Sequence, residues 1–174
     1  MGRHSDGRGE KMPSSTLDTV FQSILLGRYV ASLATHNEDG TIHLTAVWYS
    51  FEDSQLFVAT SSKTRKSRNV AARPKASIMF DIRKAGAERG MTAAGKADVI
   101  SGEQARVINR RIHSRYLSTE AMADPRIEPV FASFDDVTIR ITPASWTTWD
   151  MATLDAQAFG GRLGGTAGYL LPLD

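Results

Sequence analysis

The chain contains no cysteine and no long apolar run, and both absences restrict what the protein does. Without cysteine, its 174 residues hold no disulfide, thiolate nucleophile, thiolate zinc site or iron–sulfur cluster. The longest apolar runs, such as 24–26 and 170–171, fall far short of the roughly 20 residues of a membrane-spanning helix. We therefore expect no membrane partner. The polar start of the chain resembles neither a signal peptide nor an anchor, which predicts a cytoplasmic protein.

Strong charge of one sign is also missing. The net charge is +2 and the sequence pI is about 9.0, whereas a duplex-binding domain is usually more basic. A recognition-helix motif and an aromatic-basic strand signature are absent too, so we do not expect a nucleic-acid partner. A nucleic-acid-binding module remains the alternative class, because the cations are locally clustered. The sequence shows no nucleophile triad, no carboxylate dyad and no metal-ligand spacing, which argues against a hydrolase and against a metal site.

The chain does have the length and the 41% hydrophobic content of one globular domain. Helical periodicity with stop signals predicts helices over 17–25, 64–72 and 101–116, the first ended by Gly27. Alternating and β-branched runs predict strands over 29–35, 42–51, 55–60, 75–83, 91–100 and 137–141, with a seventh near 146–149 beyond Pro143. Mostly antiparallel strands joined by tight turns favour a small, nearly closed β-barrel of fold class α+β.

Three segments are expected to lie outside this regular structure. Residues 1–13 form a disordered N-terminal segment, and Pro125 with Pro129 marks a loop after the third helix. Residues 151–174 form a Gly-rich C-terminal tail, which leaves 14–150 as the domain. A barrel of this size is filled by its own side chains, so a ligand would bind outside it or between two copies, which predicts a homodimer.

A basic segment between a strand and a short helix carries the strongest chemical signal. Between residues 63 and 75 there are six cations and no acid: Lys63, Arg65, Lys66, Arg68, Arg73 and Lys75. Hydroxyls at the end of a strand, free amides at a helix start and neighbouring Arg or Lys are what a phosphate monoester requires. The alternative is a solvated basic face. We interpret a second basic face, formed by Arg106, Arg110, Arg111 and Arg115, as exposed to solvent, or as a binding surface for the acidic tail of a cofactor.

The order of these pieces resembles the pyridoxamine 5'-phosphate oxidase-like FMN-binding split β-barrel superfamily, which includes flavin- and deazaflavin-dependent oxidoreductases. The resemblance covers roughly 17–150 and rests on a strand at 45–50, a strand ending at Thr60, the Arg65-Lys66 pair with Asn69, and Pro74. It implies a β-rich split antiparallel barrel of six to seven strands with flanking helices. It also implies a homodimer that binds FMN or the deazaflavin coenzyme F-420 at its interface. A hydride would then pass to or from a small-molecule substrate.

The resemblance also assigns cofactor-binding residues. The backbone of one strand would run along the ring system, at Thr45, Ala46, Val47, Trp48 and Tyr49. The phosphate would be held by Thr60, Ser61, Ser62, Arg65 and Lys66. The spacing from Lys66 to Asn69 is similar to that of the deazaflavin branch, and Trp149 would lie near the ring. No catalytic residue is assigned, although His43 is close enough to the first strand to be a candidate proton donor.

Two departures from the vitamin B6 oxidases argue against pyridoxamine phosphate as the substrate. Those enzymes carry Arg and Lys at the ends of the first flavin strand, where this chain has Thr45 and Ser50. They also carry an Arg-x-His-x-Arg clamp near the C-terminus, and nothing after Trp149 matches it. A non-catalytic flavin- or haem-binding protein of the same fold is the alternative function.

Overall fold

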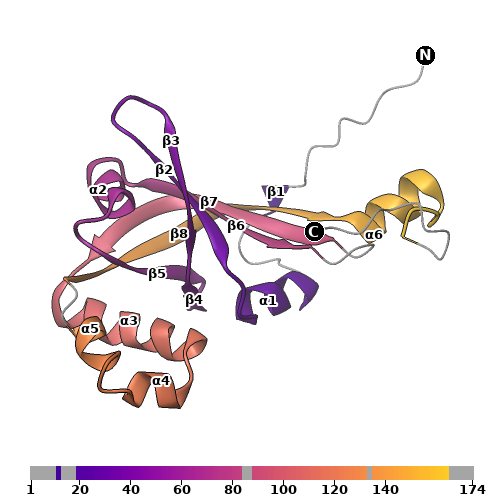
Figure 1. Cartoon of the computed structure of the whole chain (residues 1–174). Helices are drawn as coiled ribbons and strands as arrows, with labels where there is room; N and C mark the ends of the chain where they lie inside the picture. The colour runs from indigo at the N-terminus through magenta and orange to yellow at the C-terminus, as the bar shows by residue number, and fades with distance from the viewer. Residues whose placement is uncertain (1–10, 13–18, 84–87, 133–134, 165–174) are drawn as a thin grey trace.

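The computed structural model describes residues 11–12, 19–83, 88–132 and 135–164, in which an antiparallel sheet curls into a half-barrel (Figure 1). The strand order is β3-β2-β6-β7-β8-β5-β4, and β1 pairs with β8 beside this path. The strands are β1 Lys11–Met12, β2 Ala31–His36, β3 Ile42–Val47, β4 Tyr49–Glu52, β5 Gln55–Ser61, β6 Lys75–Ile82, β7 Arg89–Ile100 and β8 Asp136–Asp150. The predicted β-rich α+β class is confirmed, with seven strands in the curled sheet.

The helices flank this sheet at separate places. They are α1 Thr19–Leu26, α2 Arg65–Ala72, α3 Gly102–Tyr116, α4 Thr119–Ala123, α5 Glu128–Ala132 and α6 Met151–Leu154. In Figure 1, α3, α4 and α5 gather together below the sheet, α2 lies near the β2–β3 hairpin, and α6 follows the far end of β8. Among the described residues, no helix is both long and apolar enough to cross a membrane.

Alternating burial along the strands produces two apolar clusters. Along β2, Ala31, Leu33 and Thr35 are buried while the residues between them are partly exposed, as expected of a strand with one face on the core. The larger cluster fills the inside of the curled sheet. The smaller one lies between the sheet and α3 and consists of Phe57, Ile100, Ala105, Ile108 and Ile112. This second cluster fixes α3 against the sheet, close to the start of β8.

The chain passes from one edge of the sheet to the other at Trp48. The sequence predicts a single strand over 42–51, but the structure divides it into β3 and β4, and Trp48 belongs to neither. These two strands are the opposite edges of the sheet. The side chain of Trp48 is partly exposed between the buried Val47 and Tyr49. Trp48 is therefore the single residue that links the two edge strands, and it carries an aromatic ring.

Two predictions based on proline are wrong. The segment with Pro125 and Pro129 contains α4 and α5, because Pro129 occupies the first turn of α5, where its missing N–H is not needed. Pro143 does not interrupt β8, which runs unbroken from Asp136 to Asp150. The pairing of β7 with β8 shifts register between Ala94 and Gly95, and Gly95 pairs with Pro143. A Cβ at Gly95 would lie 2.0 Å from the carbonyl oxygen of Thr142, so only glycine allows this approach.

Part of the predicted tail is also regular. Residues 151–154 form α6, and a π-helical turn, Asp155–Phe159, follows it. The buried carboxylate of Asp155 accepts hydrogen bonds from the N–H groups of Leu163 at 2.9 Å and Gly164 at 2.7 Å. These bonds fold the chain back on itself, so the prediction of an irregular tail is wrong over 151–159. Residues 165–174 and 1–10 lie outside the described residues, and Lys11 and Met12 form β1.

Candidate functional site

A cavity of about 250 Å³ lies beside Trp48. Its walls come from four parts of the fold: the β3–β4 junction with the chain before β2, β5, α2 and α3. The lining residues are Val30, Ala46, Val47, Trp48, Ala59, Lys66 and His113. Four of these residues belong to the predicted cofactor set, and a fifth, Ala59, directly precedes Thr60 of that set. The structure therefore brings the predicted ring strand and the predicted phosphate segment to one place.

Trp48 is held in a fixed orientation by aromatic neighbours. Its ring stacks on Tyr116, with centroids 4.9 Å apart and planes 1° from parallel, and it meets the ring of His113 edge-on at 6.3 Å. The Tyr116 hydroxyl donates to the carbonyl oxygen of Tyr29 at 2.8 Å, which anchors the stack to the chain before β2. A ring held by stacking on a side chain with a partly buried hydrogen bond is preorganised to receive a second flat ring system.

Lys66 introduces a cation into this largely apolar cavity. Within the described part of the chain its ammonium group makes no hydrogen bond and no ion pair, and burial lowers the pKa of Lys66 below its ordinary value. Lys66 lies in the first turn of α2, whose N-cap Thr64 accepts a hydrogen bond from the N–H of Ser67. The first N–H groups of a helix favour a nearby anion, so this end of the cavity suits a negative group.

Several predicted phosphate ligands have partners inside the protein. The hydroxyls of Thr60 and Thr64 lie 2.9 Å apart, and the Ser61 hydroxyl accepts from the N–H of Lys63 at 3.3 Å. The Ser62 hydroxyl donates to the carboxylate of Asp135. The basic segment is free of acids in sequence, but the fold places Asp135 beside it. A phosphate would have to displace this carboxylate before it could accept a hydrogen bond from the Ser62 hydroxyl.

Asn69 and Tyr49 also bond to the protein itself. The Asn69 amide donates to Thr35 Oγ1 at 3.1 Å and to Asn37 Oδ1 at 2.9 Å, and its oxygen accepts from Arg73 at 3.3 Å. This arrangement ties α2 to the β2–β3 hairpin. The Tyr49 side chain is fully buried, and its hydroxyl lies 2.9 Å from the carbonyl oxygens at the end of α1. Both side chains therefore have structural partners, and the backbone N–H of Tyr49 also donates within the protein, to the Tyr116 hydroxyl at 3.4 Å.

Other members of the predicted set lie at the edges of the site or far from it. Thr45 is partly exposed on β3, and Arg65 is exposed at the start of α2, on the side of the hairpin turn. Trp149 lies near the opposite end of β8 from Val137, the residue that pairs with Thr60. At about 3.3 Å per residue the two positions are roughly 40 Å apart along the strand. Trp149 therefore does not reach the Trp48 cavity of its own chain.

His113 is the titratable residue of this cavity that sequence reasoning did not assign to the site. Its ring lies between Trp48 and Phe131, with the Phe131 centroid 4.5 Å away. Burial lowers its pKa below the ordinary value, against an opposing effect of Asp136. The available signal was its position three residues before Tyr116 on one helix, which places the two side chains on one face. His43 lies on β3 opposite Thr35 and does not line the cavity.

The second basic face is largely paired rather than solvated. Arg115 donates to the carbonyl oxygens of Leu25, Leu26 and Gly27, so it caps the end of α1. Arg111 pairs with Glu52 at 2.8 Å, and Arg106 pairs with Glu103 at 2.7 Å. Arg110 is the member of this face with neither a hydrogen bond nor an ion pair from its side chain among the described residues.

The chain belongs to the pyridoxamine 5'-phosphate oxidase family. The model of this family matches residues 17–150, which contain the half-barrel, α2 and α3. This match confirms the family to which the sequence was compared on its motifs. No curated protein matches the sequence.

Solved structures share the fold at low sequence identity. A conserved hypothetical protein of Mycobacterium tuberculosis is 23% identical, with a TM-score of 0.65 over 80% of this chain and 88% of its own. An F-420 reductase is 19% identical, with a TM-score of 0.57 over 75% of this chain and 98% of its own. A haem storage protein of Vibrio cholerae is 18% identical, with a TM-score of 0.59 over 76% and 94%. At these identities the likeness shows a common fold, which serves both redox and binding proteins.

Proposed function

We propose that the protein binds FMN or the deazaflavin coenzyme F-420, with the ring system at Trp48 and the phosphate near Lys66, and that it is an oxidoreductase acting on a small organic molecule. One observation carries the proposal. The Trp48 cavity combines an apolar aromatic wall with a half-buried ammonium group that has no anion beside it among the described residues. A flat ring joined to a phosphate supplies both missing partners, since the ring stacks and the phosphate pairs with the cation.

The size of the cavity supports a site shared between two copies. Its volume of about 250 Å³ is below the range of roughly 300–1,000 Å³ that is usual for drug-sized ligands. One chain therefore encloses only part of a cofactor as large as FMN. We propose a homodimer in which a second copy covers the rest, and Trp149 of that copy is the predicted residue that would reach the ring from the other side.

The bound cofactor would supply hydride transfer, which protein side chains cannot perform alone. The residues of the chain position and protect it. Trp48 and Tyr116 orient the ring, Lys66 with the start of α2 holds the negative end, and Val47 with Ala59 excludes water from the ring. The His113 imidazole lines this cavity, and burial lowers its pKa, which favours the neutral ring with one N–H donor and one acceptor nitrogen.

Titration of the purified full chain with FMN and, in parallel, with the deazaflavin coenzyme tests this proposal. We expect saturable quenching of tryptophan fluorescence with one of them, at one cofactor per chain. Lys66→Gln should weaken that binding by about tenfold or more, because the phosphate loses a charge-assisted contact. Lys75→Gln is the matched control, since Lys75 is exposed on β6 and does not line the cavity. Failure of both cofactors to bind would refute the proposal, and equal affinities of the two variants would refute the role of Lys66.

A haem-binding function is the second candidate, because the His113 imidazole makes no hydrogen bond within the described part of the chain. A neutral imidazole beside an aromatic cavity is a suitable axial ligand for haem iron. Titration with haemin distinguishes the two functions. A sharp absorption band that is lost in His113→Phe supports haem binding, and the same titration curve for both proteins excludes it.

A further inference from the structure

A second cavity, of about 290 Å³, lies between α3 and the α4–α5 segment. Its apolar wall consists of Val107 on α3, Met122 on α4 and Phe131 on α5, and Arg110 and His113 also line it. The apolar side chains come from three separate helices, so the cavity exists only because α4 and α5 fold back towards α3. The predicted loop over this segment would not have enclosed such a space.

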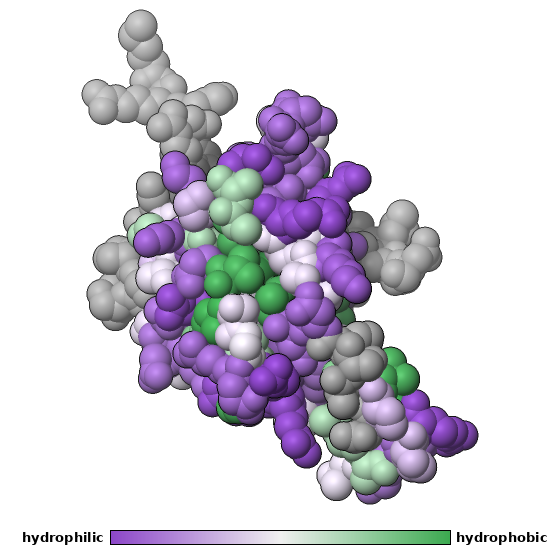
Figure 2. Space-filling model, turned by 90° about the vertical axis from the view of Figure 1, so that its left-hand side faces the viewer, coloured by the Kyte–Doolittle hydropathy of each residue, from purple (hydrophilic) through white to green (hydrophobic). Residues whose placement is uncertain are grey.

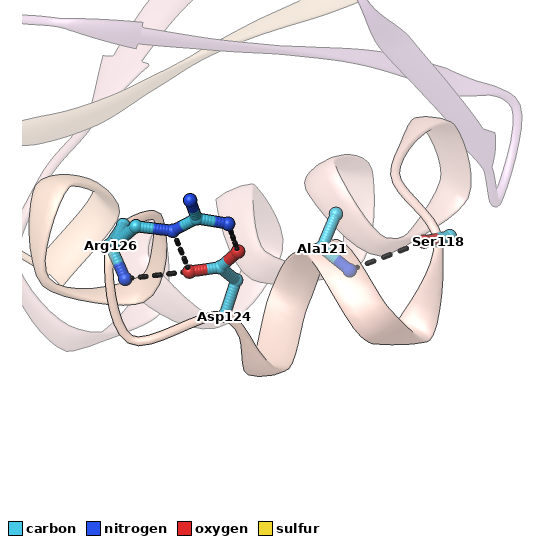
Figure 3. Close-up of polar contacts among 4 residues, drawn as sticks. All are labelled: Ser118, Ala121, Asp124 and Arg126. Atoms are coloured by element: carbon cyan, nitrogen blue, oxygen red, sulfur yellow. Dashed lines mark hydrogen bonds and ion pairs between the residues drawn. The ribbon is translucent and has the colours of Figure 1, made fainter.

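The α4–α5 segment has its own internal bonds, which Figure 3 shows. The Ser118 hydroxyl caps α4 by accepting from the N–H of Ala121 at 3.2 Å. Between the helices, the Asp124 carboxylate accepts from the backbone N–H of Arg126 at 2.8 Å and from its Nε at 2.9 Å. This pairing lowers the pKa of Asp124, so its carboxylate remains charged well into the acid range. The segment is thus a defined wall of the cavity.

His113 belongs to both cavities. It lines the Trp48 cavity and the second cavity, with its ring 6.3 Å from Trp48 on one side and 4.5 Å from Phe131 on the other. Its two ring nitrogens have no hydrogen-bond partner within the described ranges. A neutral imidazole offers one donor and one acceptor, so it can bond to a group in either space. The two cavities are therefore neighbours separated by one polar ring.

The charges around the second cavity leave one cation unpaired. Arg106 is bonded to Glu103 through Nε at 3.0 Å and a terminal nitrogen at 2.7 Å, so these two charges neutralise each other. The Asp136 carboxylate accepts from the Asn109 amide at 3.1 Å, on the inner side next to His113. Arg110 is exposed and has no acidic partner among the described residues. An anion is therefore favoured at Arg110 and disfavoured next to Asp136.

We propose that this second cavity is the substrate site of the cofactor centre, and that it takes a small, largely apolar molecule with a single carboxylate. The apolar part contacts Val107, Met122 and Phe131, and the carboxylate binds to Arg110. The position of His113 brings the inner end of this molecule next to the ring bound at Trp48. The assignment of this cavity as a substrate site rests on the proposed function, whereas the binding of an apolar carboxylate does not.

Two compounds of similar shape, one charged and one uncharged, test the site without any cofactor. 2-Naphthoate and 2-naphthamide are titrated into the full chain and followed by calorimetry. We expect the carboxylate to bind about tenfold more tightly than the amide, because only the carboxylate pairs with Arg110. Arg110→Gln should remove this difference, and Val107→Trp should abolish binding of both by filling the cavity. Val107 is 52% exposed, so the larger side chain does not disturb the core. Arg111→Gln is the matched control for loss of a nearby arginine, because Arg111 lies next to Arg110 on α3 but does not line the cavity, and it should bind like the wild type.

The possible results separate this inference from the proposed function. Equal affinities for the two compounds, or unchanged naphthoate binding in Val107→Trp, would overturn the assignment of the cavity. Lys66→Gln should retain naphthoate binding even where it loses FMN, so failure of the cofactor site leaves this result intact. With FMN bound, addition of naphthoate should change the flavin absorption spectrum, and the change should be smaller in His113→Phe. A spectrum that does not respond would overturn the role of the cavity as the substrate site.

Discussion

Replacing Asn69 with alanine should lower the free energy of unfolding by about 2–3 kcal/mol, because the side chain ties α2 to the β2–β3 hairpin. Two donated hydrogen bonds are lost, to Thr35 at 3.1 Å and to Asn37 at 2.9 Å. Each is worth about 1 kcal/mol net. Thr35 is only 1% exposed, so its hydroxyl is left buried without a partner, which adds about another 1 kcal/mol.

Urea unfolding followed by tryptophan fluorescence measures this loss. With a denaturant slope of about 2 kcal/mol per molar, the midpoint should fall by roughly 1–1.5 M. The double variant Asn69→Ala with Thr35→Val provides the control, because valine removes the hydroxyl that the single variant leaves unpaired. Its midpoint should therefore lie above the value expected from adding the two single losses.

The same variant also decides between a structural and a ligand-binding Asn69. The family resemblance places this residue among the cofactor ligands, whereas the structure uses its amide inside the protein. An unchanged urea midpoint together with weaker FMN binding would refute our reasoning, since it would mean that the amide contacts the cofactor and contributes nothing to the fold.

Two further predictions concern α3. Arg115→Gln should lower stability by about 1–2 kcal/mol, because Arg115 caps the C-terminus of α1, and faster hydrogen exchange confined to α1 would check it; equal exchange would contradict the capping role. The pKa of His113 is lowered in the folded protein, so the unfolded chain binds a proton first as the pH falls. The free energy of unfolding should therefore decrease as the pH drops below 6.5, with an uptake of about one proton per chain on unfolding. His113→Phe should lack this decrease in urea unfolding measured between pH 5 and 8. The same pH dependence in both proteins would assign the decrease to other groups.

The features that sequence predicts well are those set by neighbours along the chain. The helix at α2 follows from Thr64 as its cap and Pro74 beyond its end, and the hairpin turn follows from Gly40, which has a φ of 82°. The basic segment with Lys66 is equally local. These short-range signals were sufficient to place the strand, turn and helix that form one side of the candidate site.

The features that sequence does not predict depend on contacts between distant segments. Trp48 stacks on Tyr116 from α3, and His113 joins the same cavity, although the chain between them includes several strands. Asp135 reaches Ser62 in the same way. Pro129 was misread for a different reason: a proline in a first turn and a proline in a loop have the same local requirements. Only the packing of α4 and α5 against α3 distinguishes the two.

The position of β3 at an edge of the sheet affects how the ligand specificity of such a site can change in evolution. The outer edge of β3 is unpaired within the described part of the chain, and α2 begins directly after the turn beyond β5. A ligand at this corner would meet peptide groups, which almost every amino acid supplies equally. Replacement of the side chain of Thr45 or Ala46 would then leave these backbone contacts to the ligand unchanged. Figure 2, viewed from the left-hand side of Figure 1, shows an apolar area surrounded by hydrophilic residues. Ligand choice would therefore rest on a few side chains, so a new specificity needs only a few substitutions on an inherited scaffold.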